Sequence, residues 1–199
     1  MIAAADAIIA AEPVLTRTDT IIGDGDHGTG MSRGFTTMKQ EISDKQYESP
    51  RELFHDCGIS LVRSMGGASG VLFGTLLIGG LAEIEGLTTL EGKSLYAYLV
   101  GGIRAVIKRG RAKAGDKTMV DALLEAEKQM RSLEVESSGV DEVMRAAATG
   151  AREGAEATKK MLPHLGRSKN FREKALGVPD PGALSVSVLF DGIATALEG

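Results

Sequence analysis

Three aspartates stand close together in the first quarter of the chain, with glycines between and after them. The stretch reads Asp19-Thr20-Ile21-Ile22-Gly23-Asp24-Gly25-Asp26-His27-Gly28. Three ionised carboxylates at such spacing repel one another unless a cation joins them. Ligand sets made only of oxygen suit Mg²⁺ or Ca²⁺. We therefore predict a metal site at Asp19, Asp24 and Asp26, against the alternative of an Asp-rich turn or helix cap.

Two familiar motifs fit this stretch poorly. An EF-hand loop that began at Asp24 would need ligands where Gly28 and Phe35 stand. Residues 23–28 also match G-x-G-x-x-G, but no strand precedes them, and the two aspartates inside the turn would repel a pyrophosphate that lacks metal. Neither an EF-hand nor a Rossmann dinucleotide site is expected.

Two other stretches are suited to phosphate. Gly66-Gly67-Ala68-Ser69-Gly70 precedes an apolar run, and a helix that starts there presents free backbone N–H groups. Close helix packing through small residues is the alternative. Residues 110–118 nearly spell a Walker A loop, but Asp116 intrudes before Lys117-Thr118 and no strand precedes, so a P-loop NTPase is not expected.

Basic side chains are also present near these stretches. Arg167 has the planar donor geometry that matches phosphate oxygens. The segment before Thr118 adds four more cations. For any one of them, a solvated surface charge is the alternative explanation. The four are Arg109, Arg111, Lys113 and Lys117.

The elements that must position these residues are helical. The apolar period and the start and stop signals, such as Ser49-Pro50-Arg51-Glu52, predict eight helices and no convincing strand. We expect one all-α domain over residues 1–199, built as an up-and-down antiparallel bundle. The expected helices are 1–11, 29–41, 49–65, 70–85, 94–109, 118–133, 140–161 and 184–197.

The chemically unusual residues fall in alternate connections between these helices. They occupy the connections at residues 18–28, 65–70, 109–118 and 166–183. The connections at 42–48, 86–93 and 134–139 contain no comparable residues. In an up-and-down bundle, alternate connections emerge at the same end. The pattern therefore predicts a single site at one end of the bundle, with the parts needed for phosphoryl transfer: metal ligands, backbone amides and an arginine.

Composition narrows the function classes. The net charge is −4 and aromatic residues make up 4%, which argues against a nucleic-acid-binding protein. The single cysteine, Cys57, excludes an internal disulfide and favours a reduced compartment, most simply the cytoplasm; no signal peptide is evident. Residues 64–82 carry no charge, but six of these 19 are glycine, so we expect a buried helix rather than a membrane span.

Several blocks, in order along most of the chain, resemble the L subunit of bacterial dihydroxyacetone kinases. The first is Asp19 to Gly34, with Asp-x4-Asp-x-Asp-His-Gly and Met31-Ser32-Arg33-Gly34-Phe35. The others are residues 66–74, Gly115-Asp116-Lys117-Thr118-Met119-Val120-Asp121 and Asp180-Pro181-Gly182-Ala183. The resemblance implies an eight-helix antiparallel barrel that binds ADP or ATP at one end through two Mg²⁺ ions.

Residue roles follow from the same resemblance. Asp19, Asp24 and Asp26 would be the metal ligands, and Arg167 would face the transferring phosphate as the catalytic residue. A further set of residues would contact the nucleotide. It comprises His27, Gly28, Thr29, Gly30, Ala68, Ser69, Gly110, Met119, Arg167, Asp180, Pro181 and Gly182.

The resemblance also implies partners. A separate K-type subunit would hold the ketose, so this chain alone would be inactive, and a homodimer is a further expectation. The nucleotide is either exchanging ATP or a bound ADP that a phosphotransferase-system protein rephosphorylates. The chain departs from the family pattern at 166–172 and at Val178-Pro179, which leaves open dihydroxyacetone against a related ketose or tetrulose. A non-catalytic nucleotide-binding module and a membrane-embedded helical protein are alternatives from other classes.

Overall fold

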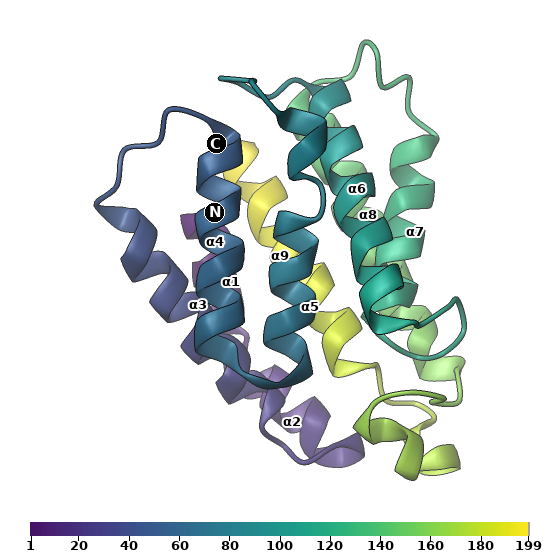
Figure 1. The fold of residues 1–199 in the computed structure, drawn as a ribbon. Helices are drawn as coiled ribbons and strands as arrows, with labels where there is room; N and C mark the ends of the chain where they lie inside the picture. Colours follow the sequence, from purple (N-terminus) through teal and green to yellow (C-terminus); the bar gives the residue numbers. More distant parts are fainter. Residues whose placement is uncertain (199) are drawn as a thin grey trace.

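The computed structural model describes residues 1–198 as a ring of helices that run alternately up and down (Figure 1). Within those residues it contains nine α-helices and no strand, which confirms the predicted all-α class. The helices are α1 (Ile2–Ala10), α2 (Glu12–Ile22), α3 (His27–Ser43), α4 (Pro50–Met65), α5 (Gly67–Ile78), α6 (Gly92–Gly110), α7 (Met119–Arg131), α8 (Val140–Ala157) and α9 (Pro181–Leu197).

The ring is built from neighbours in the sequence and closed by the two terminal helices. From α3 onward each α-helix packs against its successor, and α9 packs against both α8 and α1. The interior is filled by buried apolar side chains, among them Phe35 and Phe73, whose rings meet edge to face at 6.4 Å. Closure of this ring confirms the predicted antiparallel barrel.

The first predicted helix corresponds to α1, but a further helix, α2, follows it, so the prediction that Asp19 lies in a loop was wrong. Residues 12–22 form α2, which follows α1 after the single residue Ala11, itself in the right-handed region. Pro13 is compatible with this helix because it stands in the first turn of α2, where its missing N–H is not needed. The β-branched Thr18 and Thr20 are accommodated because their hydroxyls donate to the carbonyls of residues 14 and 16.

Other predicted boundaries also shift. The helix expected to end at Glu85 stops at Ile78, because Gly79-Gly80 leads into a short 3₁₀ turn, Leu81–Ile84. The helix expected to run to Met161 ends at Ala157. Beyond it lie three 3₁₀ turns, Thr158–Lys160, Arg167–Asn170 and Arg172–Ala175.

Small residues let the helices approach closely. A Cβ on Gly150 of α8 would lie 2.6 Å from Ala126 Cα, and one on Gly154 would lie 2.6 Å from Ala122 Cα. The backbones of α7 and α8 are therefore in direct contact, and side chains larger than hydrogen do not fit at these two positions. This packing explains how a chain with few aromatic residues still closes a dense ring.

One segment, Gly67–Ile84, has the length and composition of a membrane span, with a mean hydropathy of 1.5. It is not one continuous α-helix, since it comprises α5, the Gly79-Gly80 turn and the 3₁₀ turn. It packs in the ring between α4 and α6, with Phe73, Leu76 and Leu77 buried. A core helix satisfies the same length and composition criteria, as expected from the sequence.

The four connections that contain the chemically unusual residues lie at one end of the ring. These are α2–α3, α4–α5, α6–α7 and α8–α9, all at the lower end in Figure 1. The connections α3–α4, α5–α6 and α7–α8 lie at the opposite end. The predicted convergence is therefore confirmed.

Candidate active site

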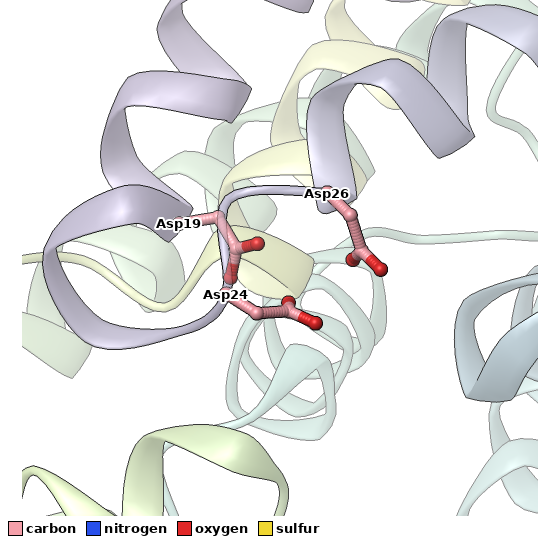
Figure 2. A group of neighbouring side chains, drawn as sticks. All are labelled: Asp19, Asp24 and Asp26. Carbon is pink, nitrogen blue, oxygen red and sulfur yellow. The ribbon is translucent and has the colours of Figure 1, made fainter.

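The three aspartates form one cluster at the lower end of the ring (Figure 2). One carboxylate oxygen from each of Asp19, Asp24 and Asp26 lies within 4.8 Å of the others. Asp19 projects from the last turn of α2 and is buried, whereas Asp24 and Asp26 are exposed in the α2–α3 connection. A Cβ on Gly23 would lie 2.0 Å from Asp19 Oδ1, so glycine leaves room for this carboxylate.

The donor set fits a hard divalent cation. All three groups offer carboxylate oxygens, which Mg²⁺ prefers, and protein sites for Mg²⁺ commonly supply one or two carboxylates and leave other positions to water or phosphate. Asp19 is already oriented, because its Oδ2 accepts a hydrogen bond from the His27 backbone N–H at 3.1 Å. The two exposed carboxylates face the open end of the site, where a polyphosphate has access.

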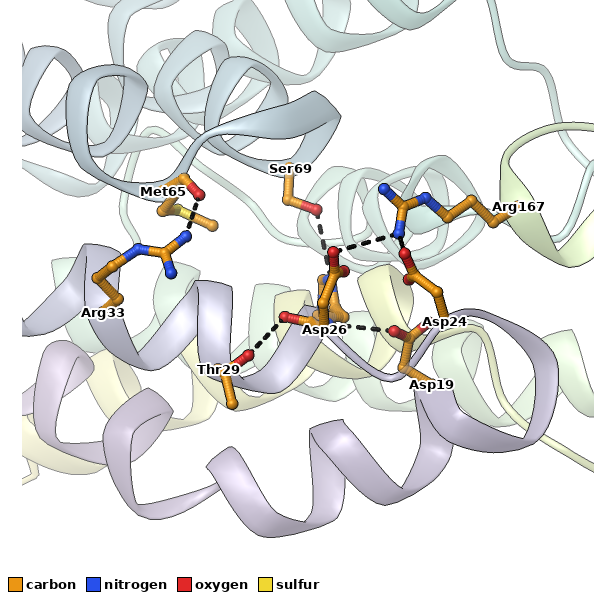
Figure 3. Close-up of polar contacts among 9 residues, drawn as sticks. Asp19, Asp24, Asp26, Thr29, Arg33, Met65, Ser69 and Arg167 are labelled. Carbon is orange, nitrogen blue, oxygen red and sulfur yellow. Dashed lines mark hydrogen bonds and ion pairs between the residues drawn. The ribbon is translucent and has the colours of Figure 1, made fainter.

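Arg167 lies against the two exposed carboxylates (Figure 3). Its guanidinium forms an ion pair with Asp24, and its Nη1 lies 3.2 Å from Asp26 Oδ2. The side chain comes from the α8–α9 connection, 141 positions along the chain from Asp26, and stays 62% exposed. Screening by solvent makes such a pair weak, so the arginine is free to exchange partners.

His27 connects three helices at the inner wall of the site. Its Nε2 lies 2.8 Å from Ser185 Oγ on α9, and its Nδ1 lies 3.3 Å from Ser69 Oγ on α5. Ser185 donates its single proton to Pro181 O, so its oxygen accepts from His27 Nε2–H and leaves Nδ1 to accept from Ser69. Burial lowers the pKa of His27, which keeps this neutral tautomer in place.

The α4–α5 turn presents backbone N–H groups. Gly66 and Gly67 both have positive φ, 71° and 61°, a conformation that favours glycine. Arg33 holds the end of α4, donating from Nε to Ser64 O at 3.1 Å and from Nη2 to Met65 O at 2.8 Å (Figure 3). The start of α5 is thereby fixed with its N-terminal amides at the site, which is suited to an anion.

The start of α7 is capped by its own side chains. Thr118 Oγ1 accepts from Val120 N–H, and Asp121 accepts from the Thr118 N–H at 2.8 Å and the Gly115 N–H at 2.6 Å. This capping box ends the α6–α7 connection at the cavity and places Met119 in its wall.

The start of α9 carries a buried carboxyl group. Asp180 is the N-cap of α9, and its side chain accepts from the Ala183 N–H at 2.8 Å. Burial raises the pKa of Asp180 to about 7, against the opposing effects of the Ala183 N–H and of Lys117. At this N-terminus, Pro181 and Gly182 reach the cavity.

All four connections line one cavity of about 840 Å³, a size suited to a nucleotide. Of the predicted nucleotide contacts, Gly28 alone is not in the wall: it packs against α2, where a Cβ would meet Thr16 and Glu12. The others line the cavity: His27, Thr29, Gly30, Ala68, Ser69, Gly110, Met119, Arg167, Asp180, Pro181 and Gly182.

The cavity also includes residues that the sequence did not single out. Leu72, Phe73, Val106 and Leu165 supply an apolar wall beside the polar end. They carry no motif, and helical periodicity identifies them only as buried side chains. Among the expected rim cations, Arg109 and Lys117 both line the cavity, but Lys117 is fully buried and its charge is not presented to solvent.

A closed ring of antiparallel helices, with an oxygen-donor cluster and a nucleotide-sized cavity at one end, defines a class of helical-barrel kinase domains. The profile of the DAK2 domain matches residues 21–195. The chain belongs to the DAK2 domain family, and the kinase assignment expected from the sequence is confirmed.

Curated relatives support the same assignment. The chain is 34% identical over 184 residues to the ADP-binding subunit DhaL of the PEP-dependent dihydroxyacetone kinase of Escherichia coli, covering 92% of this chain and 88% of that subunit. It is 32% identical over 188 residues to the D-erythrulose kinase of Mycolicibacterium smegmatis, covering 94% of this chain but 32% of that protein. Relatives of the first kind are subunits, so kinases of this kind comprise partner subunits.

A solved structure has the same fold. The dihydroxyacetone kinase of C. freundii in complex with AMP-PNP and Mg²⁺ superposes with a TM-score of 0.73 at 26% identity. The match covers 98% of this chain and 32% of that one, so the chain spans about a third of that kinase.

Proposed function

We propose that this chain acts, as one domain, as the phosphoryl-transferring subunit of a dihydroxyacetone-type ketose kinase and binds ADP or ATP with Mg²⁺. The observation that carries the proposal is the meeting of Asp19, Asp24, Asp26 and Arg167 at the mouth of a single nucleotide-sized cavity. It is supported by the relative named as an ADP-binding kinase subunit and by the relative solved with AMP-PNP and Mg²⁺.

Different residues of the chain have different roles in this proposal. The three aspartates would hold two Mg²⁺ ions, which would supply positive charge to neutralise the phosphate oxygens. Backbone N–H groups at Ala68 and Ser69 hold the phosphates at the start of α5. The apolar wall, including Leu72 and Phe73, encloses the base and excludes water from the polar end.

Arg167 is the catalytic residue of this proposal. Charge in the transition state of phosphoryl transfer spreads over three equatorial oxygens, which a planar guanidinium matches well. Its exposure and its weak pairing with two carboxylates leave it able to turn to that group. The α8–α9 connection that carries it lines the cavity at the lower end of the ring (Figure 1), and we infer that an acceptor approaches from this side.

The acceptor site belongs to a partner. We propose a separate K-type subunit that holds dihydroxyacetone, or a related ketose such as erythrulose, and a cytoplasmic location for the pair. The nucleotide is either ATP that exchanges or ADP that stays bound and is rephosphorylated by a phosphotransferase-system protein.

The test is reconstitution. The purified chain is mixed with a K-type subunit and either dihydroxyacetone or erythrulose, and phosphorylated ketose is measured with ATP or with bound ADP and a phosphotransferase donor system. We expect product only with both subunits, and retained ADP in the donor-dependent mode. Tight Mg²⁺-nucleotide binding without product under either regime would identify a non-catalytic binding module instead.

A further inference from the structure

Lys117 is a lysine with no exposed surface in a connection at the active end of the ring. Its backbone has φ +58°, a left-handed conformation that glycine adopts without strain and lysine does not. Burial lowers the pKa of its ammonium group, so both its backbone and its charge are in unfavourable settings. A lysine in this setting depends on the contacts of its side chain to offset the cost of burial.

The contacts of Lys117 lie on two carbonyls that are far apart in the sequence. Its Nζ donates to Thr158 O at 2.5 Å and to Val178 O at 2.6 Å. These residues stand at the two ends of the α8–α9 connection, and Arg167 lies midway between them. One ammonium group therefore joins the beginning and the end of the segment that carries the catalytic arginine.

Other hydrogen bonds also join the two ends of this segment, which we call the base of the 158–180 loop. The Gly177 N–H donates to Lys159 O at 2.8 Å, and the Asp180 N–H donates to Thr158 Oγ1 at 2.9 Å. The His164 N–H donates to Asp116 O at 3.2 Å, which ties the segment again to the α6–α7 connection. Residues 158–180 are thus a closed loop fixed at its base, and Lys117 is a buried cation that contacts this base.

Two carboxyl groups lie near the ammonium group of Lys117. Asp180, the N-cap of α9, and Asp121, in the capping box of α7, are the carboxyl groups that favour its charged form. Both carboxyl groups fix helix starts at the cavity. The ammonium therefore connects the α8–α9 loop with the starts of two helices that line the site.

We propose that Lys117 is a positioning residue: it fixes the base of the 158–180 loop so that Arg167 and the start of α9 hold their place at the nucleotide. This rests on the proposed function, in which Arg167 acts on the transferring phosphate. Lys117 also lines the cavity, but its Nζ is bonded to the two carbonyls of the loop, so in this proposal it acts through the loop.

The test compares Lys117→Met with Lys160→Met. Methionine keeps the apolar stem but removes the ammonium, whereas Lys160 is exposed on the same segment. In the reconstituted kinase we expect kcat per folded protein to fall by about 10- to 100-fold in Lys117→Met, because misplacement of a catalytic group on this scale has such an effect. Nucleotide Kd should change much less, since most of the cavity wall comes from other connections. Lys160→Met should behave as the wild type.

Hydrogen exchange measures how well the 158–180 loop is ordered. Amides of residues 158–180 should exchange faster in Lys117→Met while those of α3, α4 and α8 do not, and n-propylammonium should restore both kcat and protection in Lys117→Ala. A uniform loss of protection, or a folded variant with normal kcat, would show a merely structural lysine and overturn the proposal.

The wild-type protein provides a measurement that does not depend on a variant folding. The amides of Gly177 and Asp180 should exchange on the order of 100-fold or more slowly than unstructured peptide, because the fixed base protects them. Exchange at the unprotected rate would overturn the proposal. If the wild type shows no ketose phosphorylation, the proposed function fails, but exchange in the variants still decides whether Lys117 orders the loop.

Discussion

Arg167 Nη1 lies 3.2 Å from Asp26 Oδ2, and the same guanidinium pairs with Asp24. The arginine therefore occupies the side of the carboxylate cluster where a cation is expected. Mg²⁺ would compete with the guanidinium for these two carboxylates, and the phosphate of the nucleotide would then be the partner left for the guanidinium. In the proposed function, this exchange of partners would link metal binding to the position of Arg167.

Arg167→Lys should lower turnover far more than nucleotide affinity. Lysine keeps the charge but loses the planar two-pronged donor, which matters mainly in the transition state. We expect kcat to fall on the order of 100-fold in the reconstituted kinase, and nucleotide KM to change little. Steady-state kinetics with the K-type partner measure both, and Lys169→Met in the same loop is the control. A normal kcat with a raised KM would make Arg167 a binding residue.

Asp24→Ala should abolish Mg²⁺-dependent nucleotide binding. Loss of supporting groups around a metal typically weakens binding by about 10- to 100-fold, so loss of a ligand should exceed that range. Calorimetric titration of ADP with and without Mg²⁺ measures the effect, and Asp44→Ala, an exposed aspartate at the end of α3, is the control. Unchanged ADP affinity in Mg²⁺ would contradict the assignment of the cluster.

Mg²⁺ and nucleotide together should stabilise the fold more than the sum of their separate effects. The carboxylates of the cluster repel one another until metal and phosphate join them. Saturation at 100 times Kd contributes about 2.7 kcal/mol by mass action. Thermal unfolding with ADP, with Mg²⁺ and with both gives the comparison. Strictly additive shifts of Tm would argue against a shared site.

Stability should fall between about pH 4 and 7 because of Asp180. Its pKa is raised to about 7 in the folded chain from an ordinary value of 3.8, so the folded state holds the proton more tightly than the unfolded state. The contribution is full below the unfolded pKa and lost as pH rises through the folded pKa. Asp180→Asn still accepts from the Ala183 N–H and should lack this decline.

Urea unfolding of both proteins across the range measures the difference, with Asp44→Asn as the control for a carboxyl group on the surface. Parallel profiles for wild type and Asp180→Asn would mean that Asp180 is not the group responsible.

Gly150→Ala should destabilise the protein by about 1–3 kcal/mol, although alanine is the better helix former. Its Cβ would lie 2.4 Å from Glu125 O and 2.6 Å from Ala126 Cα, so α7 and α8 would have to separate. Chemical denaturation measures the loss. Ala146→Gly, at a partly buried position of α8, is the comparison; it creates no clash, so its effect should come from helix propensity and the loss of one partly buried methyl group.

The sequence predicts most of this site because its residues are of unusual type and fall in alternate connections. Asp19, Asp24 and Asp26 are identifiable from their spacing alone, but the helix around Asp19 is hidden by Pro13 and three threonines. Their hydroxyl bonds to the preceding turn become visible only in the structure.

The supporting residues are harder to predict. Lys117 looks like any surface lysine until its two carbonyl partners, 41 and 61 positions away, are brought to it. Ser185 likewise orients His27 across 158 positions, and no local pattern marks it. Such long-range partners are fixed by the closing of the ring, which periodicity does not encode.

The closing of α9 on α1 also bears on how the chain folds. Most contacts in the ring join helices that are consecutive in the sequence, and such local contacts form quickly. The α9–α1 contact spans nearly the whole chain, so its loop-closure entropy is the largest of any pair in the ring. Residues 180–182 reach the cavity from the start of α9. We therefore expect the site to be completed late in folding, so that partly folded chains should lack a full nucleotide cavity.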